Sequence, residues 1–204
     1  NKDLFFAKKV IDDNLIDYYH PESIGLVVKT NYLAKFTKGK CIILSTDDTV
    51  PEKNWDEAIF NSANWDSEVV LNTRDGSEEK EKRHYIIKGL IISKIRYQKL
   101  GYIFHPELEH LFCDDFHSWI SYRDGVVLEK KGILLEHTHP CVGKSQWDKF
   151  YERVNTKEKY KLGGVKFLDL VQRNIDQKIL DSLVDEYIVS DKKRQSKVKF
   201  VLEA

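Results

Sequence analysis

Short apolar segments alternate with helical patterns along the first half of this chain, and this alternation limits its fold more than any other feature. The apolar runs are SIGLVVK at 23–29, CIILS at 41–45 and SEVVLNT at 67–73. Patterns with helical spacing separate them, TNYLAKFTKGK at 30–40 and NWDEAIFNSA at 54–63. Strands that alternate with helices are typical of α/β proteins. The sequence therefore predicts a mostly parallel central sheet flanked by helices.

The second half continues with further elements and ends in a helical segment. A helix is expected at 2–18, near the start of the chain. The later elements expected are a strand at 84–93, a helix at 93–101 ended by Gly101, a helix at 114–125, and two strands around Lys131-Gly132 within 126–140. From Ser145 onward the pattern is helical. We expect one domain over residues 1–160, followed by a C-terminal helical segment and basic tail over 161–204.

Charge and cysteine usage exclude several classes of protein. Lys and Arg number 33, as do Asp and Glu, so the net charge is zero and nothing steers the chain toward nucleic acid. The basic tail remains a candidate contact to a membrane surface or an adjacent domain. Three scattered cysteines predict no disulfide framework and fit a reducing compartment such as the cytoplasm. No apolar stretch is long enough to be a membrane span or a signal peptide.

Two adjacent acids, Asp47 and Asp48, follow the apolar run CIILS. Ligands of open α/β sheets bind beyond the carboxyl ends of the strands, where this pair is expected. Carboxylate oxygens suit hard cations such as Mg²⁺ and Mn²⁺, so one acid could bind a metal while its neighbour contacts a ribose hydroxyl. The structural alternative is a turn in which an aspartate and the following Pro51 set the backbone.

A second acidic pair, Asp114 and Asp115, stands at the start of the helix expected at 114–125. Backbone N–H groups and the helix dipole keep a carboxylate ionised there, as a general base must be at neutral pH. Simple capping of the helix is the alternative.

Two histidines, His137 and His139, lie in the segment LLEHTHP. In a strand, residues two apart share a face, so both imidazoles could serve as metal ligands. They could equally be polar residues near a strand end. A zinc site that adds Cys141 is a weaker alternative, because no C-x-x-C pair accompanies it.

The order of these motifs resembles that of GT-A nucleotide-sugar glycosyltransferases, most closely family-2-like members. The matching stretches are NYLAKFTKGKCIILSTDDTVPEKNWD, IKGLIISKIRYQKLGYIFHPELEHLFCDDFHSWISYRDG and ILLEHTHP. The resemblance implies a GT-A (Rossmann-like) fold. Where the strict metal motif reads D-x-D, this chain has Thr46 in place of the first acid. The family's first strand and base pocket are not recognisable in residues 1–19, and with no methionine present we expect that the sequence is not the whole gene product.

The resemblance also implies roles for individual residues. Asp115 would be the catalytic base, and the acceptor or donor would contact Asp114 and Trp119. The remaining implied contacts are a metal bound by Asp48 and His137, with His139 as the fallback histidine, and a nucleotide bound by Asp47 and Asn31. Lys29 is a further candidate contact to the nucleotide. The expected activity is inverting, Mn²⁺- or Mg²⁺-dependent transfer of a sugar from a UDP- or GDP-sugar to a carbohydrate or glycan acceptor, in polysaccharide or glycoprotein synthesis. A non-catalytic nucleotide-sugar or carbohydrate-binding module and a metal-dependent phosphoesterase are the alternatives.

Overall fold

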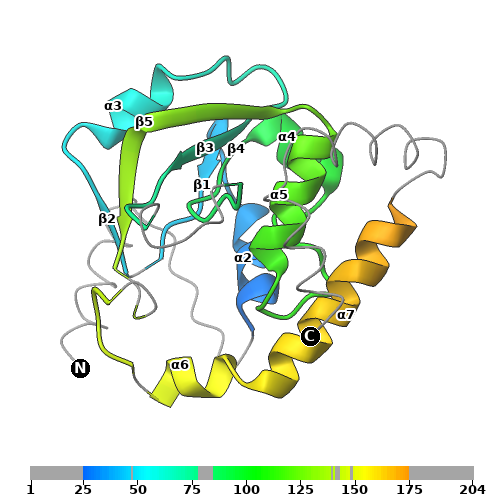
Figure 1. The fold of residues 1–204 in the computed structure, drawn as a ribbon. Helices are drawn as coiled ribbons and strands as arrows, with labels where there is room; N and C mark the ends of the chain where they lie inside the picture. Colours follow the sequence, from blue (N-terminus) through cyan, green and yellow to red (C-terminus); the bar gives the residue numbers. More distant parts are fainter. Residues whose placement is uncertain are drawn as a thin grey trace, which may run out of the picture.

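The computed structural model describes residues 25–46, 48–77, 85–138, 140, 143–147 and 149–174. The helix expected at 2–18 and most of the segment 161–204 lie outside these residues. Figure 1 shows a curled sheet with helices on both sides of it. No helix within the described ranges is long and apolar enough to cross a membrane.

Six helices are described. They are α2 (Leu26–Ala34), α3 (Trp55–Phe60), α4 (Lys94–Leu100), α5 (Cys113–Arg123), α6 (Lys149–Val154) and α7 (Lys157–Arg173). The helices expected at 54–63, 93–101 and 114–125 are confirmed by α3, α4 and α5. The chain leaves α4 through Gly101, whose φ of 77° lies in the left-handed region that glycine adopts without strain.

Helix α2 overturns the strand expected at 23–29. The run LVVK forms the first turn of this helix, which ends at Ala34, well before Gly39. Val27, Thr30 and Ala34 are its buried residues, and they recur at helical spacing. A short apolar run fits a buried strand and a buried helix equally well, and here the helical spacing of the following residues decides.

Within the described residues, five strands form one sheet in the order β1-β4-β3-β5-β2. Their bounds are Cys41–Ile43 (β1), Thr49–Pro51 (β2), Val70–Arg74 (β3), Ile91–Ser93 (β4) and Val127–His137 (β5). Only β3 and β5 are parallel, and the other three pairs are antiparallel. The expected mostly parallel sheet is therefore wrong for the described strands. Parallel neighbours need a crossover connection, usually a helix, and the described residues between β3 and β4 contain none.

The central strands are buried on both faces, which explains their continuous apolar runs. One core lies against α2, α5 and α7 and takes a residue from each of β1, β3 and β4, namely Ile42, Val70 and Ile92. A second core lies against α3 and takes the neighbouring residues Ile43, Leu71 and Ile91. Successive strand residues point to opposite faces, so one run supplies both cores.

Strand β5 is a single strand where two were expected around Lys131-Gly132. Its first part pairs with β3, from Val127 to Lys130, and its last three residues pair with β2. A register shift lies between Thr73 and Arg74, after which Arg74 still pairs with Leu134 of β5. The strand stays continuous because it exchanges one partner for another, and it bends across the sheet as it does so (Figure 1).

Helix α7 lies along α5 and spans the expected domain boundary at residue 160. Its Leu170 is 1% exposed within the core that α5 shares. A Cβ on Gly163 would meet the Phe112 ring at 2.9 Å, so the helix approaches the segment before α5 closely at this glycine. Residues up to Arg173 therefore belong to the same packed unit.

Candidate functional site

Asp48 lies in the short turn between β1 and β2, directly after the strand that the sequence predicts. Strands β2 and β5 pair with Thr49 opposite His137. The backbone N–H of Thr138 donates to the Asp48 carbonyl at 2.8 Å. This register brings His137 beside Asp48.

Three side chains contact the Asp48 carboxylate. His137 Nε2 lies 2.9 Å from Oδ2, the Tyr151 hydroxyl donates to Oδ2 at 3.1 Å, and the Thr46 hydroxyl donates to Oδ1 at 2.5 Å. Burial raises the pKa of Asp48, but the Thr46 hydroxyl, the charge of His137 and the Tyr151 hydroxyl together hold that pKa below its ordinary value. Asp48 is therefore ionised at neutral pH, as a metal ligand must be.

A second polar group follows β3. Lys88 Nζ lies 2.9 Å from Asp75 Oδ2 and donates to Ser77 Oγ at 2.7 Å. The Ser77 hydroxyl and backbone N–H both donate to Asp75 Oδ1. Burial raises the pKa of Asp75, but the hydrogen bonds from Ser77 and Lys88 lower this pKa by more. The pKa of Asp75 therefore lies below its ordinary value. A lysine ammonium is thus held by an ionised partner close to the Asp48 site.

The start of α5 carries the second acidic pair as predicted. Asp115 is 8% exposed, and its N–H donates to Asp114 Oδ1 at 3.0 Å. Phe112, which precedes the helix, has a φ of 65°, a conformation that costs a bulky residue about 1–2 kcal/mol. Its ring stacks on Phe167 of α7 at 5.8 Å, and this packing holds the strained residue in place.

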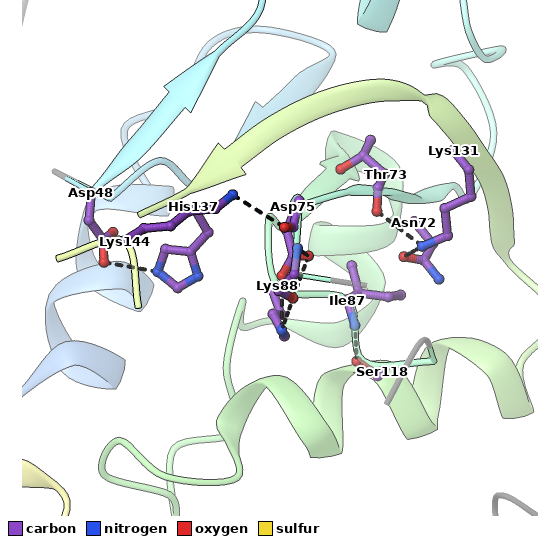
Figure 2. A network of polar contacts seen from close by, with 12 residues as sticks. Asp48, Asn72, Thr73, Asp75, Ile87, Lys88, Ser118, Lys131, His137 and Lys144 are labelled. Carbon is purple, nitrogen blue, oxygen red and sulfur yellow. Dashed lines mark hydrogen bonds and ion pairs between the residues drawn. The ribbon is translucent and has the colours of Figure 1, made fainter. Parts of the chain in front are cut away.

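A series of contacts joins the Asp48 site to α5. Figure 2 shows Asp48 and His137 at one end, Asp75 and Lys88 between, and the helix with Ser118 beyond them. Asp48 contacts His137, whose backbone N–H donates to the Asp75 carbonyl. The Asp75 carboxylate pairs with Lys88. Ile87, the residue before Lys88 in the chain, donates its backbone N–H to Ser118 Oγ. The Ser118 hydroxyl also donates to the carbonyl of Asp114 at 2.6 Å. These contacts connect the Asp48 site to the backbone of α5 at Asp114, and the carboxylate of Asp115 is not part of the series.

Three predicted contact residues lie elsewhere. The Asn31 side chain donates to Phe104 O at 2.7 Å and accepts from the N–H groups of Ile103 and Phe104, so it holds the segment before α5. Trp119 packs on Phe116 and lies under the Arg123 guanidinium. In the described part of the chain, the Lys29 side chain makes no hydrogen bond. A nucleotide contact of Lys29 and Asn31 and a substrate contact of Trp119 stay predictions.

The described donors fit a divalent cation that takes further ligands from substrate or water. Asp47, His139 and Cys141 lie outside the described residues, and within those residues no group of three or more His, Cys, Asp or Glu could hold a metal. Asp48 and His137 supply one carboxylate oxygen and one imidazole nitrogen. Mn²⁺ accepts both donors, and Mg²⁺ is commonly held by one or two carboxylates plus substrate phosphates.

Three residues of this region are missing from the sequence prediction. Asp75 comes two residues after the strand expected at 67–73, so the rule that singled out Asp48 would also have found it. Lys88 and Tyr151 carry no local signal. Tyr151 reaches Asp48 from 103 positions away, a relationship that only the folded chain reveals.

Searches against protein-family models, curated proteins and solved structures returned no match to this chain.

Proposed function

We propose that this protein is a metal-dependent glycosyltransferase that moves a sugar from a UDP- or GDP-sugar to an acceptor hydroxyl. The observation that supports this most is the 2.9 Å contact between Asp48 and His137. These residues come from the two motifs, STDD and LLEHTHP, to which the resemblance assigns the metal. The pairing of β2 with β5 brings these two motifs together across 89 positions, with the carboxylate and the imidazole side by side.

A GT-A-like fold is part of the same proposal. The order of the motifs supports it, as does the acidic turn after the apolar strand β1. The three antiparallel strand pairs are a departure from the sheet expected for this fold. Fold alone never proves activity, so the proposal depends on the site.

The chain's own residues would divide the reaction as follows. Asp48 and His137 hold the cation, which when bound neutralises charge on the diphosphate. Asp115 takes the proton of the acceptor hydroxyl while that oxygen bonds to the anomeric carbon. The bond from this carbon to the diphosphate oxygen breaks in the same step, so the anomeric configuration inverts.

The deciding experiment is a thermal-shift panel of UDP- and GDP-sugars with and without Mn²⁺, followed by transfer assays. A donor at a hundred times its Kd should stabilise the protein by about 2.7 kcal/mol, and only with metal present. Asp48→Asn should abolish the shift. Asp66→Asn is the matched control, since Asp66 is an exposed acid paired with Lys40. Metal-dependent binding without transfer or hydrolysis would point to a binding module, and phosphate release from diesters without sugar transfer to a phosphoesterase.

A further inference from the structure

Trp147 differs from the other tryptophans in its exposure. Of the four in the chain, Trp65 is 6% exposed, and Trp55 and Trp119 are partly buried against the two cores. Trp147 is 51% exposed and belongs to neither core. A half-exposed indole offers a large, flat, apolar surface with a polar N–H, which is the surface that ligand rings stack on.

The position of Trp147 connects it to the candidate site. Its ring packs edge-to-face on the Tyr151 ring, with centroids 5.9 Å apart and an interplanar angle of 79°. The Tyr151 hydroxyl donates to Asp48 Oδ2 at 3.1 Å. Outward from the Asp48–His137 pair, the phenol of Tyr151 on α6 therefore comes first, followed by the indole of Trp147 just before α6.

We propose that Trp147 and Tyr151 form a stacking surface for a pyranose ring of the acceptor. A pyranose has one face of C–H groups, which suits the indole, and a rim of hydroxyls, which suits the phenol and carboxylate. The choice of ligand class rests on the proposed function. The polar groups that follow the indole, the Tyr151 hydroxyl and the Asp48 carboxylate, match the rim of hydroxyls of a pyranose, and the uridine probe below tests a nucleobase as the other candidate ring.

Binding of simple glycosides to the full chain tests this surface directly. The probes are methyl glucopyranoside, methyl galactopyranoside and methyl mannopyranoside, followed by saturation-transfer NMR and calorimetry with Mn²⁺ and UDP present. We expect saturable binding of at least one probe, at least tenfold weaker binding in Trp147→Ala, and recovery to within about threefold in Trp147→Phe. Phe60→Ala is the control, because Phe60 is 71% exposed on α3. Thermal unfolding should not distinguish Trp147→Ala from wild type, because this indole is outside both cores.

The contrary results are equally definite. No glycoside binding by the wild type, or equal binding by Trp147→Ala, would overturn the surface. Binding of uridine that depends on Trp147 would show that Trp147 stacks on the nucleobase, and this result would also overturn the proposed pyranose surface.

Turnover separates this inference from the proposed function. Trp147→Ala should raise the KM for the acceptor at least tenfold. If the wild type turns over no donor yet binds glycosides through Trp147, the transferase proposal fails and the stacking surface stands. If the wild type transfers sugar and Trp147→Ala keeps the wild-type KM, the stacking surface fails alone.

Discussion

The imidazole of His137 and the carboxylate of Asp48 lie 2.9 Å apart because two strands pair with Thr49 opposite His137. The contact is set by backbone hydrogen bonds rather than by the two side chains themselves. Either side chain can therefore be replaced while the other keeps its place. This separates the role of each side chain in binding from its role in folding.

Replacing Asp48 by Asn should abolish Mn²⁺ binding, measured by electron paramagnetic resonance of the free ion. The amide keeps the size of the side chain but loses the charge that the cation requires. Tyr151→Phe removes only a hydroxyl that contacts Asp48, so we expect affinity to fall by about tenfold, as for an outer-shell partner. Unchanged Mn²⁺ affinity in Asp48→Asn would remove Asp48 from the metal site.

Replacing Asp115 by Asn should slow sugar transfer by about 10²–10⁴-fold, the usual contribution of a general base. The Kd for donor should hardly change, because the base acts on the acceptor hydroxyl. Asp114→Asn, one residue away in the same turn, is the comparison. Slowing of transfer by Asp114→Asn alone would move the base to the neighbouring acid. Initial rates and donor titrations on the same preparations decide between them.

The sequence predicts those parts of the molecule that depend on local pattern. Three local features are present in the structure: the acids after CIILS, the acidic first turn of α5, and the end of α4 at Gly101. Strand direction depends on which distant segments pair, which no short window contains. The run LVVK illustrates the limit, since its apolar residues suit a strand until Thr30 and Ala34 are seen to share a buried helical face. Tyr151 reaches Asp48 only through tertiary packing, so no motif announces it.

Arg96 should be a main determinant of stability. Its side chain is fully buried, with NH1 3.0 Å from Glu68 and NH2 2.6 Å from Asp124. Asp124→Ala leaves part of this buried charge without its partner, and we expect a loss of about 3 kcal/mol in the free energy of unfolding. Asp66→Ala breaks the exposed pair with Lys40 and should cost less than about 1 kcal/mol. Urea denaturation measures both, and equal losses would contradict the role of burial.

His117 should make the protein sensitive to mild acid. Burial lowers the pKa of this imidazole to about 4, outweighing the hydrogen bond to the Ile103 carbonyl, which raises it. The unfolded state takes up the proton near pH 6.5 and the folded state only near its lowered pKa, so acid favours unfolding between these values. From pH 7 to pH 4.5 the wild type should lose about 3 kcal/mol more than His117→Asn, which does not titrate. Parallel pH profiles of the two proteins would exclude this histidine as the cause.

Two glycines should respond to the same substitution with opposite signs. Gly101 has a φ of 77° with nothing within 4 Å of an added Cβ, so alanine there meets backbone strain and no clash. Gly101→Ala should lower the free energy of unfolding by about 1 kcal/mol. Gly132 in β5 also has open space but no positive φ. Gly132→Ala should therefore raise the free energy of unfolding by about 0.5 kcal/mol, because alanine restricts the unfolded chain. Thermal unfolding of both variants checks the signs. A stabilising Gly101→Ala would mean that α4 does not end in a left-handed residue.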